Sequence, residues 1–296
     1  MRNKAFIRTY WLMIVPGYAW LVLFSIVPMF GILMAFEDYN PMYGYFRSPW
    51  VGLSNFRYMF SMADSWSIIY NTVFIATMKV VLNLIFPLIF ALLLNELRLA
   101  RYKRLVQTVT YMPYFLSWVI LAGILKDVLG YTGPINMLRA AVGLPKVMFF
   151  GNAASFPWLL ILSDVWKTFG FNAIIYLAAL TGISPSLYEA AAIDGAGRWR
   201  RLLHVTMPGI AVTVVMLMTL GLGGVLNAGF DQVFNMYNKL VYSTGDIIDT
   251  WVYRTGLINL KFSLATAVGL FKSVVGFILV ALGYVLADRY AGYRIF

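Results

Sequence analysis

The residues with the strongest potential for specific chemistry form one polar segment, which reads EAAAIDGAGRWRRLLHVTMP over residues 189–208. The segment separates two apolar stretches that are each long enough to cross a bilayer. Ser186 and Glu189 have the spacing of a capping box, so a helix should begin here. Small alanines follow, and Gly195 and Gly197 then predict a sharp turn. The pattern favours a helix–turn–helix at the membrane surface, with a small, weakly polar face free to bind a partner.

The same segment also fits an ordinary interfacial loop. Its arginines, Arg198, Arg200 and Arg201, could simply meet lipid phosphates. The residue types alone leave both explanations open.

Catalytic chemistry has little support in the chain. There is no cysteine, and the single histidine, His204, lacks a partner for metal binding or nucleophile activation. The phosphate-binding pattern GxxxxGK(S/T) is absent. Only Asp164, with Asp127 near a span end, lies within the apolar stretches, so paired-carboxylate catalysis is not expected. We therefore expect no catalytic residue, metal site or cofactor in this chain; if ATP drives the protein, another subunit must hydrolyse it.

Polar residues within the apolar stretches are candidates for a translocation path, namely Lys79, Asn83, Asn172 and Lys272. Neither lysine has a nearby acid on its own helix, so each must reach water, another helix or an anionic ligand. Lys79 could also snorkel to the membrane surface, and the amides could merely pack against neighbouring helices. Asp164 can pair with Lys167 three residues later.

Composition places these residues in a membrane protein. The 296 residues are 61% hydrophobic and only 12% charged, with a mean hydropathy of +0.77. A soluble domain carries about twice that charged fraction. The apolar residues occur in long blocks, so the protein must share its apolar surface with lipid.

Six segments satisfy the requirement of about 20 apolar residues for a membrane-spanning helix. They cover about residues 11–36, 68–95, 105–129, 156–183, 209–230 and 262–287. The first follows a basic N-terminus, as a signal peptide would, but its apolar run is too long and no small-x-small cleavage site follows. We expect one all-α membrane domain over residues 1–296 with a retained first helix.

The basic residues predict the orientation of the spans. With both termini in the cytoplasm, the inner connections hold twelve Lys and Arg residues and the outer connections seven. The polar connection at 184–208 is then cytoplasmic. The formal net charge of +11 is thus a topology signal, and nucleic acid is not an expected partner.

The polar segment resembles the EAA loop of ATP-binding-cassette importer permeases of type I. The loop pattern is E-A-A, three residues, G, nine residues, I, one residue, L-P. The matching residues are Glu189, Ala190, Ala191, Gly195, Val205, Met207 and Pro208, with Asp194, Gly195 and Ala196 on the usual D-G-A core. Val205 and Met207 are conservative departures. The resemblance implies that Glu189, Ala190, Ala191, Asp194, Gly195 and Ala196 form a coupling helix and turn that dock on an ATPase subunit.

Other segments resemble carbohydrate-type, maltose-permease-like members. AFEDYNP at 35–41 and SPWVGLSNF at 48–56 look like the oligosaccharide and polysaccharide branch, which includes the alginate importer. The resemblance implies a multi-pass permease of the bacterial inner membrane, paired with a second homologous permease. It further implies two ATPase subunits, which bind ATP and Mg²⁺, and an extracytoplasmic solute-binding protein.

An acidic, alginate-like oligosaccharide is the preferred substrate, since carboxylates would pair with Lys79 and Lys272. Three alternatives remain: a permease for neutral oligosaccharides, an ion-coupled secondary transporter, and a membrane enzyme or scaffold. The secondary transporter would more often show inverted repeats and spans interrupted at the midplane, neither of which the sequence reveals. The enzyme or scaffold would need a catalytic cluster or a soluble appendage.

Overall fold

Helices dominate the computed structural model, which describes residues 4–291. Apart from one isolated bridge between Glu37 and Trp50, the described residues contain no β structure. Six of their helical stretches are long and apolar enough to cross a membrane: Arg8–Phe36, Ser65–Asn95, Trp118–Ala141, Phe156–Thr181, Arg198–Leu222 and Phe262–Val285. The prediction of an all-α protein with six spans is confirmed. The chain ends, with Arg2 and Arg294, lie outside the described residues, and the orientation of the termini stays a prediction.

The chain divides into two compact units, of which the first comprises residues 1–63 and 251–271. It contains α1 (Lys4–Leu21), a π-helical turn (Val22–Ile26), a 3-10 stretch (Val27–Phe36) and α2 (Ser54–Ser61). Asn55 Nδ2 donates to the carbonyl oxygens of Ala35 and Glu37, each at 3.0 Å, and so ties α2 to the end of the 3-10 stretch. Most described side chains of α1 are exposed, as expected where a helix faces lipid or another membrane helix.

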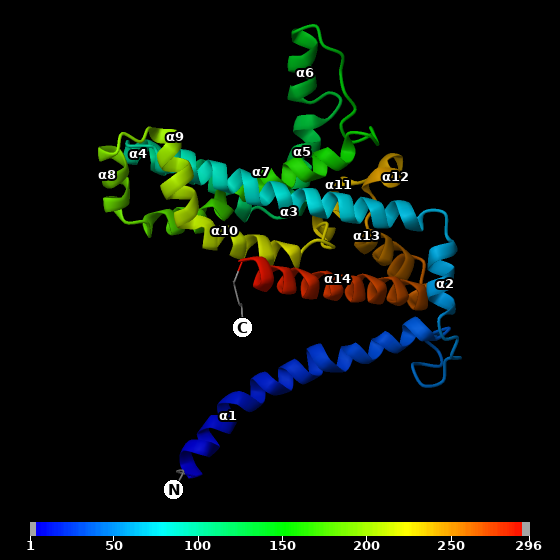
Figure 1. The fold of residues 1–296 in the computed structure, drawn as a ribbon. Helices are drawn as coiled ribbons and strands as arrows, with labels where there is room; N and C mark the ends of the chain where they lie inside the picture. The colour runs from blue at the N-terminus through cyan, green and yellow to red at the C-terminus, as the bar shows by residue number, and fades with distance from the viewer. Residues whose placement is uncertain (1–3, 292–296) are drawn as a thin grey trace. The chain divides into compact units, whose positions relative to one another are not determined.

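The second unit, residues 64–250 and 272–296, holds most of the helices. They are α3 (Ser65–Asn95), α4 (Ala100–Tyr111), α5 (Trp118–Leu129), α6 (Pro134–Ala141), α7 (Phe156–Thr181), α8 (Pro185–Ile193), α9 (Arg198–Arg201), α10 (Met207–Leu222), α11 (Phe230–Met236) and α12 (Tyr242–Gly245). The boundaries between the units fall within α13 (Ile248–Tyr253) and α14 (Phe262–Ala291). Figure 1 shows these elements along the chain. The prediction of a single permease domain stays a prediction.

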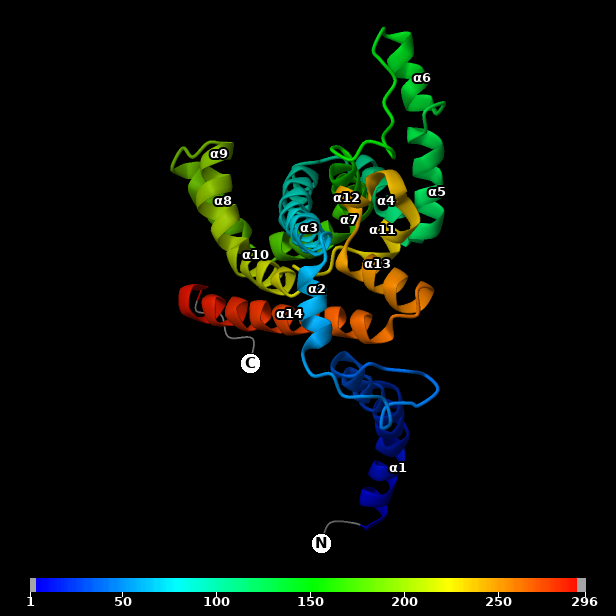
Figure 2. The same ribbon diagram turned by 90° about the vertical axis from the view of Figure 1, so that its right-hand side faces the viewer.

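Helices α3 and α7 form the centre of the second unit and lie side by side in both views (Figures 1 and 2). One apolar cluster includes Ile75 of α3 with Phe156 and Leu160 of α7, and all three are fully buried. Near the other end of the pair, Tyr176 of α7 donates its hydroxyl to the Leu84 carbonyl oxygen at 3.2 Å. Lipid tails are as apolar as leucine, so close packing and hydrogen bonds such as these hold membrane helices together.

The third span differs from the sequence-based expectation. Residues 105–129 do not form one helix, because α4 ends at Tyr111 and a 3-10 turn (Met112–Phe115) separates it from α5. Pro113 has no N–H to donate and its ring would crowd the preceding helical turn, which accounts for the break. The apolar stretch that meets the length and composition of a span is instead Trp118–Ala141, which includes the short helix α6.

The fifth span also ends earlier than predicted. Residues 209–230 were expected to be helical, but α10 ends at Leu222 and the chain is not helical again until Phe230. The sequence of this gap, GGVLNAG, explains the break, because glycine is a poor helix former and Gly229 adopts a left-handed conformation with φ +88°. The break places an irregular backbone segment beside α3 and α7, where polar side chains can meet it.

A candidate translocation cavity and coupling segment

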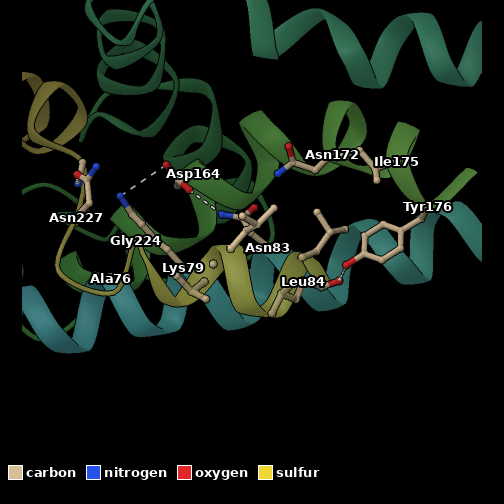
Figure 3. Close-up of a pocket in the computed structure, with 15 residues that line it drawn as sticks. Ala76, Lys79, Asn83, Leu84, Asp164, Asn172, Ile175, Tyr176, Gly224 and Asn227 are labelled. Carbon is tan, nitrogen blue, oxygen red and sulfur yellow. Dashed lines mark hydrogen bonds and ion pairs between the residues drawn. The ribbon is translucent and has the colours of Figure 1, made fainter. Parts of the chain in front are cut away.

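A cavity of about 480 Å³ lies in the second unit between α3, α7, α10 and the irregular segment 223–229 (Figure 3). Its lining is Ala76, Lys79, Val80, Asn83, Leu84, Asp164, Asn172, Ile175, Tyr176, Leu217, Leu220, Gly221, Gly224, Asn227 and Gly229. Three of the four sequence-based path candidates, Lys79, Asn83 and Asn172, are therefore brought together. Lys272 does not line this cavity.

Lys79 is the centre of a buried polar network and is only 6% exposed. Its Nζ donates to the carbonyl oxygen of Ala228 at 2.6 Å and to Gln232 Oε1, and it lies 3.6 Å from Asp164 Oδ1. Of the possibilities that the sequence left open for Lys79, the structure shows a partner on another helix. The acid belongs to α7, so a search for partners along α3 alone could not identify it.

Asp164 joins the same network from the opposite side. Its Oδ2 accepts a hydrogen bond of 3.0 Å from Asn83 Nδ2, and Thr168 Oγ1 donates to Asn83 Oδ1 at 2.7 Å. Figure 3 shows Lys79, Asp164 and Asn83 turned toward one another. Asp164 and Lys167, which the sequence allowed to pair, form no ion pair within 4 Å. Lys167 instead donates to the Tyr114 carbonyl oxygen at 2.6 Å and lies over the Tyr114 ring at 5.3 Å.

Gln232 of α11 completes the network and was missed by sequence reasoning. It is fully buried, and its Nε2 donates to the Leu160 carbonyl oxygen at 2.7 Å and to Ser163 Oγ at 2.8 Å. The amide thus connects Lys79 to α7 and fixes the start of α11. The only sequence signal was a polar pair, Asp231 and Gln232, directly after the glycine-rich gap.

Lys272 of α14 has a separate partner. Its Nζ lies 2.5 Å from Asp249 Oδ1 of α13, and both side chains are about one-quarter exposed or less. Lys272 thus also has its acidic partner on a different helix, which is one of the possibilities that the sequence left open.

Two further amides face the cavity, Asn172 from α7 and Asn227 from the irregular segment (Figure 3). Within the described residues Asn172 makes no side-chain hydrogen bond, and Asn227 only accepts from the Gly229 N–H at 3.4 Å. An amide offers two donors and an acceptor, so these side chains suit a ligand rich in hydroxyl groups. Because Lys79 and Asp164 balance each other, the cavity presents a polar but nearly neutral lining.

The segment 184–208 has the predicted helix and turn, although not the predicted cap. Helix α8 begins at Pro185, and Ser184 rather than Ser186 stands at the N-cap, with no side-chain cap bond. At the other end, the N–H groups of Gly195 and Ala196 donate to the carbonyl oxygens of Ala192 and Ala191 at 3.1 and 2.8 Å. This bond pattern requires a left-handed residue after the cap, and Gly195 supplies it with φ +75°.

The acidic and small residues of this segment are open to a partner. Glu189, Ala190, Asp194 and Gly195 are exposed, and Ala191 and Ala196 are half-buried. Within the described residues, neither carboxylate has a hydrogen-bond or ion-pair partner. The exposed Ile193, at 87%, adds an apolar contact to the same surface. The segment thus presents a short helix with unpaired acids and one exposed apolar residue.

The cavity and the segment 184–208 both lie in parts of the chain that are similar to known proteins. Residues 83–292 match the model of the family described as binding-protein-dependent transport system inner membrane component. The polygalacturonan/rhamnogalacturonan transport system permease protein YteP of Bacillus subtilis (strain 168) is 42% identical over 281 residues, which cover 95% of this chain and 88% of YteP. The similarity therefore includes the cavity and the segment 184–208.

Solved structures extend the comparison to the fold. A bacterial ABC transporter involved in the import of the acidic polysaccharide alginate matches with a TM-score of 0.89 and 33% identity, covering 98% of this chain and 99% of that one. A bacterial alginate ABC transporter in complex with an alginate pentasaccharide-bound periplasmic protein matches with a TM-score of 0.88, 33% identity and 98% coverage of both chains.

Proposed function

The chain belongs to the family of binding-protein-dependent transport system inner membrane components, and from that premise we propose that it conducts acidic oligosaccharides across the membrane. It is a multi-pass permease subunit of a type I ABC importer for carbohydrates, located in the bacterial inner membrane. It works with a solute-binding protein and with ATPase subunits. The acidic character of the substrate and the path through this chain are the new elements of the proposal.

One observation carries the choice of an acidic substrate. The relative named for polygalacturonan, a polymer of a sugar acid, and the transporter structure named for alginate each resemble this chain over at least 95% of its length. Lys79 and Lys272 do not support an acidic substrate, because both have aspartate partners within the chain. A specific observation favours the second candidate, a neutral oligosaccharide, since the charges that line the cavity balance.

The proposed path runs through the cavity, with Asn83 and Asn172 as hydrogen-bonding groups and Lys79 as a fixed charge. The free amide of Asn172 supports a direct contact with sugar hydroxyl or carboxylate groups. Lys272 stays a candidate at a second position, outside the lining of this cavity.

We propose that the energy for transport comes from other subunits of the importer. Two ATPase subunits, each binding ATP and Mg²⁺, dock on coupling segments, and Glu189, Asp194 and Gly195 carry the contact in this chain. A second homologous permease closes the path, and the binding protein delivers the ligand. ATP binding then shifts a two-state equilibrium between inward-open and outward-open forms.

The test is the ATPase activity of the whole complex in lipid. The binding protein is loaded with an acidic oligosaccharide or with its carboxyl-reduced, neutral counterpart of equal length. We expect the acidic ligand to stimulate hydrolysis more strongly, and Asn172→Leu to weaken that stimulation. Lys272→Met tests the candidate that lies outside the cavity, and we expect it to have the smaller effect. Stimulation by the neutral ligand alone would favour the neutral candidate and leave the importer assignment intact.

A further inference from the structure

A second cavity, of about 530 Å³, is lined by the end of α3 and by residues of the segment 184–208. Figure 1 shows α8 and α9 of this segment at one end of the second unit. The last turns of α3 form one wall, through Leu92 and Leu93, and Arg98 follows just beyond that helix. The opposite wall comes from α9 and the π-helical turn Leu202–Thr206. A π-helical turn in this place is notable because such turns occur often at functional sites.

Positive charge outweighs negative charge in the lining of this cavity. Arg98, Arg198 and Arg201 line it together with one carboxylate, that of Glu96. Within the described residues, none of the three guanidinium groups forms an ion pair. The Nε of Arg201 is also buried and has no hydrogen-bond partner. A buried donor without an acceptor is destabilising, so a ligand with acceptor oxygens would stabilise this arrangement.

The rest of the lining is apolar. Leu93 is 64% exposed and Trp199 is 77% exposed, and Leu202 completes the surface between them. Tryptophan is enriched where membrane meets water, at the depth of the lipid headgroups. The cavity thus combines a basic end with an apolar wall, which is the division found in a phospholipid.

We propose that this cavity binds the phosphate group of an anionic phospholipid. Arginine is suited to this ligand, because its planar fork of N–H donors matches phosphate oxygens. Basic pockets beside membrane helices recognise anionic headgroups in the same way. A free phosphate ion offers the same oxygens but would leave Leu93, Trp199 and Leu202 uncovered, so the lipid fits the whole lining better.

The bound lipid would connect two parts of the chain. Tyr188 of α8 also lines the cavity, and its hydroxyl lies 3.0 Å from Thr206 Oγ1 in the turn before α10. A phosphate held by Arg98 and Arg201 therefore bridges the end of α3 to the helices on either side of Gly195. The lipid would act as a brace for the segment that we propose couples to the ATPase.

The experiment is a lipid titration of the purified importer complex with its ATPase subunits, after delipidation in neutral detergent. Native mass spectrometry measures the binding of dioctanoyl phosphatidylglycerol, with dioctanoyl phosphatidylcholine and inorganic phosphate as the other ligands. The test variants are Arg201→Gln and, should that chain fold poorly, Arg98→Gln, which changes an exposed residue. The matched control is Arg200→Gln, because Arg200 is exposed on the same segment but does not line the cavity.

We expect phosphatidylglycerol to bind the wild type about tenfold more tightly than it binds Arg201→Gln or Arg98→Gln, with Arg200→Gln unchanged. Displacement of the lipid by millimolar phosphate would support the site with free phosphate as a second source. Equal binding of the two lipids, or an equal loss in Arg200→Gln, would overturn the proposal. Loss of the ATPase subunits from Arg201→Gln with unchanged lipid binding would also overturn it and assign the arginines to an acidic partner surface. Neither sugar nor transport enters the measurement, so an error in the substrate assignment would not alter the result.

Discussion

Lys79 is 6% exposed and contacts acceptors from three other parts of the chain, whereas Glu189 and Asp194 are exposed and have no partner among the described residues. The first region satisfies its polar groups internally, as a membrane interior requires, because an unpaired group there is expensive. The second region leaves its acids open at the surface. The buried polar groups of this permease therefore stabilise its fold, whereas the exposed acids of the segment 184–208 are available to bind another molecule.

The largest expected effect of a single substitution lies in the internal network. Asp164→Leu would leave the ammonium group of Lys79 buried without its acid and Asn83 without its acceptor. Breaking a buried pair on one side typically lowers the free energy of unfolding by about 3–5 kcal/mol. Thermal unfolding of the purified complex in detergent measures the loss.

Two controls sharpen that result. The double variant Lys79→Met with Asp164→Leu removes both charges and should regain most of the lost stability, because a paired charge is often replaceable by apolar side chains. Asp127→Leu changes an exposed acid at the end of α5 and should stay within about 0.5 kcal/mol of the wild type. If the double variant is no more stable than Asp164→Leu, the ion pair between Lys79 and Asp164 does not account for the stability of the network.

The contrast between the regions also explains what the sequence could predict. The helix from Glu189 and the turn at Gly195 follow from local rules, since alanine favours helix and glycine alone enters the left-handed region freely. The same rules misplaced the cap, because Pro185 fits the first helical position and moves the N-cap to Ser184.

Local sequence rules could not predict the network around Lys79. Its partners Asp164, Ala228 and Gln232 lie between 85 and 153 residues away along the chain. A pairing rule for residues three or four apart instead selects Lys167, which turns toward Tyr114. Side chains on one helix face could be recognised as polar, but their partners depend on how α3, α7 and the irregular segment 223–229 pack.

The second prediction tests the open region through its turn. Gly195→Val places a β-branched side chain at φ +75°, where an L-residue costs at least about 1–2 kcal/mol. Such strain would lower the population of the native turn by roughly tenfold. We expect sugar uptake into proteoliposomes to fall by a similar factor per ATP hydrolysed, while the unfolding temperature of the complex changes little.

Gly197→Val is the matched control for that turn. Gly197 has φ −66° and no atom within 4 Å of an added Cβ, so valine should be tolerated there. Normal uptake per ATP in both variants would contradict the coupling role proposed for Gly195.

The smallest expected effect comes from Glu189→Gln, which removes one exposed charge and keeps the shape of the side chain. Because Glu189 has no partner among the described residues, the free energy of unfolding should change by less than about 0.5 kcal/mol. The dissociation constant of the ATPase subunits should rise by about threefold to fivefold, as expected for a charge near the rim of an interface. That increase should shrink at high salt, because exposed charges are screened. If Glu189→Gln instead destabilises the protein as much as Asp164→Leu does, Glu189 stabilises the fold. The contrast between the stabilising network around Lys79 and a binding surface on the segment 184–208 would then be wrong.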